Sequence, residues 1–326
     1  IVGGADEVRS LFTRSVDDFR WNHKFNALAV VVGKASMITS DGDDWSRRRA
    51  AVQSAFSRRR LNRWIPMILE QADAAIDALP ARGTHEIDLY RVVRTAILEI
   101  VVRAFFGESM VDKAARFGEL MEAPQNYLEQ PAWKQLPHPF PIGRRGRVKA
   151  DRRAFDDLVG EAITSIRDNP TGDADDVLEM LVHNDSISDN EVLDQVNTLV
   201  GAGFDTTAAS LAWMLWCCGL APDIWAALRA EADEVLGAPG TDNQAVDHGT
   251  LNRLVFADRV VRESLRLHPA GVISPREAAR DIEVGGYAIT TGTLVLWSAH
   301  LSGRDPNVWS DPLRFDPDRF LDMTDD

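Results

Sequence analysis

The sequence predicts a mainly α-helical protein with a small β region near its C-terminal end. Three observations support this prediction. Apolar residues recur at helical spacing over most of the chain, one uninterrupted helix is expected from Ser188 to about Leu220, and alternating apolar residues begin only after Pro269. We therefore expect a large helical body with a long central helix, and a single domain over residues 1–326, because no linker divides the chain.

The composition is that of a globular protein with an acidic surface. Of the 326 residues, 45% are hydrophobic and 26% are charged, and the formal net charge is -14. Because an acidic chain is repelled by phosphate backbones, we expect no nucleic acid partner. The adjacent Cys217 and Cys218 suggest no disulfide framework, and no signal peptide or membrane span is visible. We therefore expect a cytoplasmic monomer.

Helical spacing defines the elements of the first half. Apolar residues indicate a helix over 45–79 with an interruption at Pro66, and a second helix over 87–106. Residues 123–146 combine several prolines with aromatic side chains, which predicts a long loop or lid. Its apolar character suits lipid-like or terpenoid molecules. Helix is expected again over 147–169.

The second half begins with the long central helix. Ser188 and Glu191 match a capping box, in which each side chain satisfies the other residue's backbone N–H, and Pro222 marks the end of the helix. Two shorter helices are expected over 222–236 and 250–267. The remaining expected elements are a hairpin over 282–289 that turns at Gly285 and Gly286, a strand over 293–296 and an irregular segment over 304–320.

The string Gly-Ala-Gly-Phe-Asp-Thr-Thr, residues 201–207, lies in the middle of the central helix. Each glycine costs about 1 kcal/mol relative to alanine in a helix interior, and Asp and Thr compete there for backbone hydrogen bonds. The string therefore predicts a local distortion with a function, while close helix packing is the alternative explanation for the glycines. A dinucleotide-binding loop is excluded, because no strand precedes the string and Thr206 stands where a third glycine is needed.

A second pattern is formed by Glu263 and Arg266, which stand three residues apart on one face of an expected helix. An isolated pair of this kind is usually a surface ion pair of little consequence. The pattern becomes specific through its neighbours: Pro269 ends the helix, the hairpin comes next, and Asp-Pro-Asp-Arg-Phe occupies residues 316–320.

In this order the motifs resemble those of the cytochrome P450 family. Trp45 and Arg49 are similar to its W-x-x-x-R helix. Residues 202–207 are similar to its A-G-x-D-T-T signature, and Glu263 with Arg266 to its E-x-x-R motif. The resemblance covers essentially the whole chain. It implies the cytochrome P450 fold and a haem-dependent monooxygenase that inserts one oxygen atom of O2 into an apolar organic substrate.

The resemblance also implies a role for each motif. Haem b is the expected cofactor, and a ferredoxin with its reductase, or a similar donor, is expected to supply electrons. Asp205 and Thr206 are the expected catalytic residues, which deliver protons to the oxygen. The other implied roles are haem propionate binding by Trp45, Arg49 and Arg276, room for oxygen at Ala202 and Gly203, and a buried ion network of Glu263, Arg266 and Arg319.

The sequence departs from the family pattern in two places. Asp318 replaces the glutamate of the P-E-R-F region, and the haem loop F-x-x-G-x-R-x-C-x-G is expected after Phe320, whereas the sequence stops at Asp326. The axial cysteine is therefore expected beyond the chain end, so that the chain itself holds no metal ligand. Because the family also has structure before its W-x-x-x-R helix, we expect a fragment truncated at both ends and inactive as it stands.

Two alternative functions remain open at this point. The chain could belong to a degenerate relative that binds no haem and acts as a helical interaction module, which an absorbance scan would detect. It could also be a haem-thiolate isomerase or dehydratase, but the intact Asp205-Thr206 pair favours oxygen activation.

Five arginines cluster near the W-x-x-x-R motif in an otherwise acidic chain. Such a patch predicts a docking surface for an acidic electron donor, while a solvated helix face is the alternative. The five residues are Arg47, Arg48, Arg58, Arg59 and Arg60.

Overall fold

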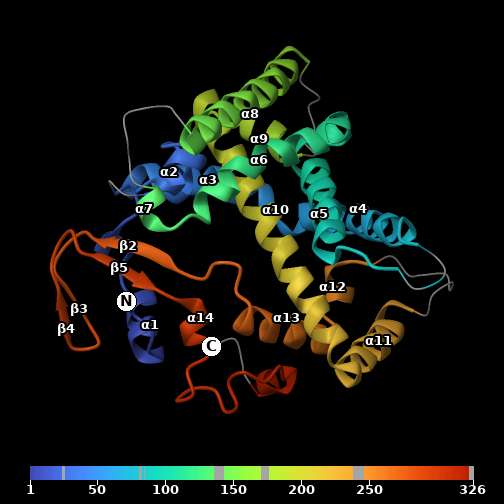
Figure 1. Ribbon diagram of the computed structural model, residues 1–326. Helices are drawn as coiled ribbons and strands as arrows, with labels where there is room; N and C mark the ends of the chain where they lie inside the picture. Colours follow the sequence, from blue (N-terminus) through green and yellow to red (C-terminus); the bar gives the residue numbers. More distant parts are fainter. Residues whose placement is uncertain are drawn as a thin grey trace. The chain divides into compact units, whose positions relative to one another are not determined.

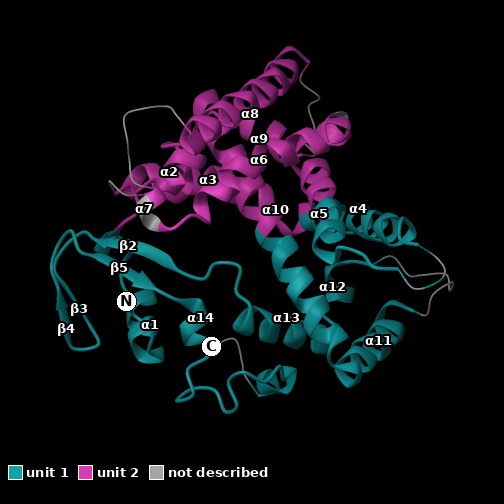
Figure 2. Ribbon diagram, in the orientation of Figure 1, with its two compact units in different colours: residues 1–19, 61–96, 206–326 teal, residues 20–60, 97–205 magenta. Residues whose placement is uncertain are grey.

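Helices dominate the computed structural model, and the strands β2 to β5 all follow helix α13 (Figure 1). The predicted fold class, mainly α with a long central helix and a small β region, is confirmed. The chain divides into two compact units (Figure 2): unit 1 holds residues 1–19, 61–96 and 206–326, and unit 2 holds residues 20–60 and 97–205. The structure describes residues 1–23, 26–80, 83, 85–135, 143–169, 176–237 and 246–322.

Aromatic packing between helices forms much of the core of unit 2. The rings of Phe106 and Phe117 stack at 4.7 Å, and Phe155 meets Phe117 edge-on at 5.5 Å. Phe117 and Phe155 are fully buried, so these contacts hold α6 against α8. The helices of unit 2 are α2 (Leu28–Val31), α3 (Gly42–Gln53), α6 (Ala114–Leu128), α7 (Ala132–Gln135), α8 (Gly143–Asp168) and α9 (Val177–Val182), with 3-10 helices at Met37–Thr39, Ser54–Phe56 and Glu108–Lys113.

Unit 1 contains the β region. One sheet has the strand order β1-β2-β5, in which β2 and β5 are antiparallel, and β3 pairs with β4 in the predicted hairpin. Gly285 and Gly286 both have positive φ, which the tight turn of the hairpin requires. The strands are β1 (Phe19–Arg20), β2 (Ser274–Ala278), β3 (Ile282–Val284), β4 (Tyr287–Ile289) and β5 (Leu294–Trp297); the helices are α1 (Ala5–Phe12), α11 (Pro222–Leu236), α12 (His248–Leu251), α13 (Val255–Leu267) and α14 (Ala299–Ser302), with 3-10 helices at Val16–Asp18 and Pro317–Phe320.

Three further helices, α4 (Arg58–Asp77), α5 (Leu89–Phe106) and α10 (Asp189–Gly219), have residues in both units. The predicted capping box at the start of α10 is confirmed. The Ser188 N–H donates to Glu191 Oε2 at 2.9 Å, and the Glu191 N–H donates to Ser188 Oγ at 3.4 Å. Pro222 begins the next helix, as the sequence predicts.

The predicted interruption at Pro66 is wrong. Pro66 lies inside α4 and is exposed. Proline has no N–H to donate to the backbone carbonyl one turn earlier, and at this exposed position water can bind that carbonyl instead. The break comes earlier, at Ser57, which is extended with φ -66° and ψ 148° and accepts the Arg60 N–H through its carbonyl. Serine is a common residue at helix starts, so this signal was present in the sequence.

The predicted lid over 123–146 is wrong in part. Helix α6 continues through Pro124 to Leu128, and α8 already begins at Gly143. Residues 136–142, which include most of the prolines of this segment, lie outside the described part of the chain.

The helix predicted over 250–267 is two helices, α12 and α13. A capping box that was not anticipated from the sequence starts α12: Asp247 accepts the Thr250 N–H at 2.8 Å. Within the described ranges no single helix is long and apolar enough to span a membrane, and α10 with α11 meet such a test only as a pair bent by 113°.

Candidate functional site

The string at 201–207 lies within α10, which is helical without a break from Asp189 to Gly219, and a local distortion inside the helix stays a prediction. Phe204 and Ala208 on one side of α10 are fully buried, and this packing offsets the low helix propensity of the string. A Cβ added to Gly203 would lie 4.0 Å from Phe105, which is ordinary contact. Close packing against a neighbouring helix therefore does not require glycine at position 203.

One face of α10 is accessible in the middle of this string. Ala202 and Thr206 are exposed, while Gly203 and Asp205 are half-buried. Because Ala202 and Thr206 are four residues apart, they lie one turn apart on the same side of the helix. The small side chains on this side allow a flat ligand to come close to the helix backbone.

Ion pairs fix the start of α10 to α3 within unit 2. Glu191 accepts hydrogen bonds from Arg47 Nη2 at 2.6 Å and from Arg48 Nε at 2.9 Å. Hydrogen bonding by Arg47, followed by Ser188 and Arg48, holds the pKa of Glu191 well below its ordinary value in spite of burial. Two of the five clustered arginines are therefore engaged in holding helices together.

A row of polar side chains on α10 binds the segment before α3. Asp194 Oδ2 accepts the Ala35 N–H at 2.8 Å, and Gln195 Oε1 accepts the Met37 N–H at 2.8 Å. Sequence reasoning missed this row, although several adjacent polar residues in a buried helix indicate that partners are needed. Further contacts join Thr198 to Ser36 at 2.6 Å and Asn197 to the Val31 carbonyl at 2.8 Å.

Gly33 lies close to α10 at the start of this segment. Its φ is +94°, and an added Cβ would lie 2.2 Å from the Asp194 carboxylate. Asp194 also forms an ion pair with Arg152 of α8. Only glycine fits this conformation and this distance, so the segment 33–40 depends on Gly33 for its place on α10.

The two residues of the W-x-x-x-R motif contact each other on α3. The Arg49 guanidinium lies 5.5 Å from the centroid of the Trp45 ring. Arg49 is exposed and Trp45 is half-buried. The ring therefore holds the cation by a cation–π contact while leaving its nitrogens accessible to an anion.

Arg276 lies on β2 in unit 1, among aromatic rings. Its guanidinium is 4.5 Å from the centroid of Phe12 and 5.4 Å from that of Phe19. Burial lowers the pKa of Arg276 from its ordinary value. A partly buried cation of this kind is stabilised by an anionic ligand.

Glu263, Arg266 and Arg319 form one buried network in unit 1. Glu263 has no exposed surface and accepts Arg266 Nε at 2.6 Å, Arg266 Nη2 at 2.8 Å and Arg319 Nε at 3.3 Å. Its Oε1 also accepts the Asp316 N–H at 2.8 Å. Arg266 in turn donates to the Pro312 carbonyl at 2.8 Å. The network therefore ties α13 to the irregular segment before residue 320.

Cys217 and Cys218 are buried, free thiols near the end of α10. Burial is the main cause that raises the pKa of Cys217 to about 11, and it also raises the pKa of Cys218. Both side chains are therefore neutral thiols at physiological pH, unlike the thiolates that bind metals. Among the described residues, no group of three or more His, Cys, Asp or Glu side chains could hold a metal ion.

Comparison with known proteins identifies the family. The family model described as Cytochrome P450 matches residues 1–325. The chain belongs to the cytochrome P450 family. Among its relatives, a Mycobacterium tuberculosis protein that carries the name cytochrome P450 139 is 30% identical over 330 residues, which are 97% of this chain and 73% of that protein. Pentalenene oxygenase of Streptomyces avermitilis is 30% identical over 296 residues, covering 87% of this chain and 63% of that enzyme.

Solved cytochrome P450 structures share the fold. The retinoic acid-bound cyanobacterial CYP120A1 superimposes with a TM-score of 0.84 at 24% identity, covering 98% of this chain and 71% of that protein. This likeness agrees with the fold that the motif order predicts.

Each unit brings some of the P450 motif residues together. The ion network is complete in unit 1, and Trp45 contacts Arg49 in unit 2. Asp205 and Thr206 are consecutive on α10. Arg276 belongs to unit 1.

The residues present fit a haem group. The accessible small-residue side of α10 at Ala202 and Thr206 suits a flat macrocycle. Arg276 in unit 1, whose cation is partly buried, and Arg49 in unit 2, whose cation is held by a ring, each carry a guanidinium group of the kind that pairs with a carboxylate.

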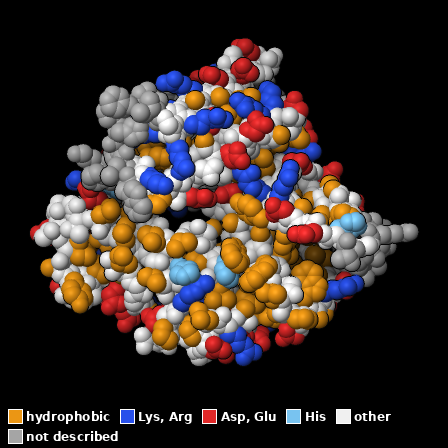
Figure 3. Space-filling model, viewed as in Figure 1, with side chains coloured by type: hydrophobic (Ala, Val, Ile, Leu, Met, Phe, Trp, Pro, Cys, Tyr) orange, Lys and Arg blue, Asp and Glu red, His pale blue; other side chains and the backbone are white. Residues whose placement is uncertain are grey.

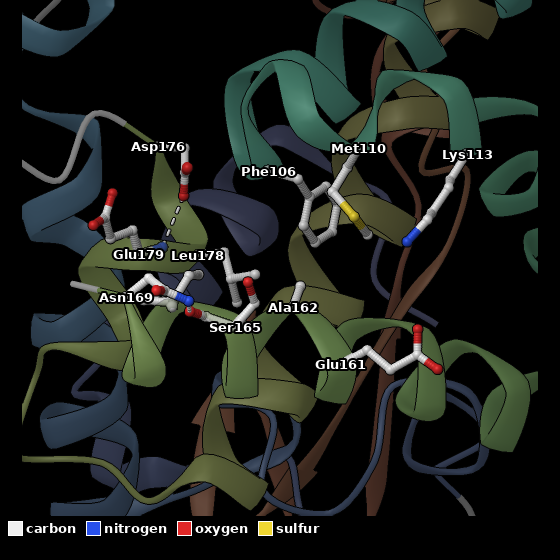
Figure 4. A pocket seen from close by; sticks show the side chains of 11 residues that line it. Phe106, Met110, Lys113, Glu161, Ala162, Ser165, Asn169, Asp176, Leu178 and Glu179 are labelled. Carbon is white, nitrogen blue, oxygen red and sulfur yellow. Dashed lines mark hydrogen bonds between the residues drawn. The ribbon is translucent and has the colours of Figure 1, made fainter. Parts of the chain in front are cut away.

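A pocket of 440 Å³ in unit 2 was not anticipated from the sequence. Figure 4 shows Phe106, Met110 and Leu178 around its apolar part, with Lys113 and Glu161 at one side. None of the P450 motif residues lines this pocket. Its walls come from α5, α8, α9 and the 3-10 helix at 108–113, so no local motif could have indicated it.

Unit 1 carries several exposed aromatic residues on α10 and α11. Trp213 is 44% exposed, Trp216 is 51% exposed and Trp225 is 49% exposed. Hydrophobic side chains gather on this part of the surface in Figure 3. The imidazole of His268 stacks on Trp213 with ring centroids 4.0 Å apart, and burial is the main cause that lowers the pKa of His268.

Proposed function

We propose that the protein to which this chain belongs is a haem-dependent monooxygenase that inserts one oxygen atom of O2 into an apolar organic substrate. The observation that carries the proposal is the accessible side of α10 with Ala202, Asp205 and Thr206, in a member of the cytochrome P450 family. The name of pentalenene oxygenase, a relative, describes oxygenation of pentalenene and supports an apolar substrate. Bound haem b would supply the iron-centred activation of O2.

The proposed roles follow from the positions of the side chains. Arg49 beside Trp45, and Arg276, would each bind a haem propionate, because guanidinium groups pair with carboxylates at two points. Ala202 and Gly203 would leave room for oxygen beside the bound haem. Thr206 and Asp205 have the remaining catalytic roles. The Thr206 hydroxyl would hold a water and pass a proton toward the oxygen, and Asp205 would bring that proton from solvent.

The proton-delivery role is tested with Thr206→Ala in the haem-loaded protein. We expect O2 and reductant to be consumed still, while product per reductant falls and peroxide rises, because the proton donor is lost. Thr207→Ala is the matched control, since Thr207 is also exposed and follows directly on α10. Equal product per reductant in the wild type and both variants would contradict the role of Thr206.

We further propose that neither cysteine of the 326-residue chain ligates haem iron. The support is that Cys217 and Cys218 are buried neutral thiols within α10. The reduced, carbon monoxide-bound spectrum of the 326-residue chain should lack the red-shifted Soret band of thiolate ligation. Observation of that band would mean that one of these thiols deprotonates and binds iron.

The electron donor is proposed to be an acidic ferredoxin or flavodoxin that docks at the start of α4. Arg58 and Arg59 are exposed there, whereas Arg47 and Arg48 are engaged with Glu191. Cations at a helix N-terminus are disfavoured by the helix dipole, so arginines at this place indicate a use other than stability.

Stopped-flow reduction of the haem-loaded Arg58→Glu/Arg59→Glu variant tests the docking site. Reduction should slow at low salt, and the difference from the wild type should close as salt rises. Arg229→Glu on α11 is the control, because Arg229 is well exposed but lies far along the sequence from the cluster. Equal slowing by Arg229→Glu would show a general charge effect instead of a docking site.

A further inference from the structure

Arg276 and Trp297 are neighbours on one face of the β2–β5 sheet in unit 1. Ser274 pairs with Trp297, and Arg276 pairs with Val295. Paired residues of antiparallel strands project to the same face, and so do alternate residues of one strand. Arg276 and Trp297 are therefore diagonal neighbours, close enough for long side chains to serve one ligand.

Phe12 of α1 contacts both side chains. The Arg276 guanidinium lies 4.5 Å from the centroid of Phe12, and the Trp297 ring lies 4.9 Å from it at an interplanar angle of 78°. Trp297 also packs against the hydrophobic cluster that contains Val295. These contacts hold both side chains in place before any ligand binds.

The indole nitrogen of Trp297 is a buried donor without an acceptor in the part of the chain that the structure describes. Buried indole N–H groups normally find a partner, and in the same unit Trp309 donates to the Ser302 carbonyl at 3.0 Å. The Phe12 ring offers at most an N–H···π contact, which is a weak substitute for an oxygen acceptor. An acceptor is therefore needed at Trp297, beside a cation.

We propose that Trp297 donates its indole N–H to the haem propionate that Arg276 binds, as a positioning residue for the cofactor. This inference rests on the proposed haem-dependent function. A carboxylate offers two oxygens with about four acceptor positions, so it accepts the guanidinium fork and a further N–H together. Because indole is neutral, it fixes the propionate without adding charge to a partly buried region.

The test uses Trp297→Phe in the haem-loaded protein, with Trp225→Phe as the matched control. Trp225 lies in the same unit and is 49% exposed, so it reports the general effect of losing an indole. We expect Trp297→Phe to lose haem to a scavenging apoprotein roughly 10- to 100-fold faster than the wild type, because a hydrogen bond to a charged group is lost. The propionate-bending band in the resonance Raman spectrum should shift as well.

Stability of the haem-free protein separates this role from packing. Removing the indole N–H alone should leave the urea midpoint of the haem-free protein unchanged or higher, because the donor has no acceptor among the described residues, whereas Trp297→Phe also loses ring contacts with the hydrophobic cluster. Incorporation of β-(3-benzothienyl)alanine at position 297 keeps both rings and replaces the N–H by sulfur, so it should reproduce the faster haem loss even if Trp297→Phe folds poorly.

Three outcomes would count against the inference. Equal haem-loss rates and unshifted Raman bands in the Trp297 and Trp225 variants would overturn it. Faster haem loss with an equal loss of stability in the haem-free benzothienylalanine variant would show that the indole only packs. A wild-type protein that takes up no haem would overturn the proposed function, and this inference with it.

Discussion

Replacing Glu263 by glutamine should destabilise the protein far more than the same change at a surface ion pair. Glu263 has no exposed surface and accepts four hydrogen bonds, three of them from the guanidinium groups of Arg266 and Arg319. Glu263→Gln keeps the shape of the side chain but leaves both guanidinium groups buried without a counter-charge. The NH2 group of the new amide would also face the guanidinium N–H groups, so that hydrogen-bond donors meet without an acceptor.

The expected loss is about 3–5 kcal/mol, the usual cost of removing one partner of a buried ion pair. This is a large fraction of the roughly 5–15 kcal/mol by which folded proteins are stable. With a urea dependence of about 2–3 kcal/mol per molar, the unfolding midpoint should fall by about 1–2.5 M.

The chain offers a matched control in Arg116 and Glu119 of α6. This pair has the same three-residue spacing and an Nη1–Oε2 distance of 2.8 Å, but its side chains are 55% and 66% exposed. Glu119→Gln should cost at most about 1 kcal/mol, because water solvates both charges. Urea unfolding of both variants, followed by circular dichroism, measures the difference. Equal midpoint shifts would refute the argument that burial makes the Glu263 network critical.

Three further perturbations test other parts of the structure. Gly33→Ala should destabilise the protein by about 2 kcal/mol or more, because φ of Gly33 is +94° and an added Cβ would collide with Asp194. Gly160→Ala in α8 is the control and should be neutral or stabilise by up to about 1 kcal/mol, because nothing lies near the added Cβ. Urea midpoints in the opposite order would contradict this prediction. Because folding lowers the pKa of Glu191, its contribution is present above the ordinary carboxyl pKa of about 4.3 and is lost as pH falls, so Glu191→Gln should flatten the decline of the urea midpoint between about pH 5 and 3. Folding also lowers the pKa of His268 below its ordinary value of about 6.5, so the unfolded chain binds more protons in the window just below that pH; stability should rise with pH there, and His268→Phe should remove this slope.

Local signals in the sequence predicted most of the fold. The capping box of Ser188 and Glu191, Pro222 after α10, and the paired glycines of the β3–β4 hairpin act within a few residues, so their structural effect follows directly from the sequence. The two helix boundaries that were missed, at Ser57 and Asp247, carried similar local signals, which the continuous helical spacing around them outweighed.

The non-local parts of the site could not be predicted in the same way. Asp194 and Gln195 bind backbone groups about 160 residues earlier in the chain. The surroundings of the Trp297 indole N–H, a buried donor without an acceptor among the described residues, depend on where β5 and α1 meet. The spacing of Glu263 and Arg266 predicted that they share a helix face but not that Arg319 and several backbone carbonyls complete the network. Helix α10 runs through residues 201–207 without a break, and the fully buried Phe204 supports the helix there.

The polar row of α10 has a consequence for solvent exchange in the segment 33–40. Much of this segment is irregular, and irregular segments usually exchange their amide hydrogens rapidly. Here the Ala35 and Met37 amides donate to Asp194 and Gln195, so their deuterium uptake should follow the slow opening of α10. Peptides from this stretch should therefore be as protected as a core helix, and proteases should cleave the chain elsewhere first.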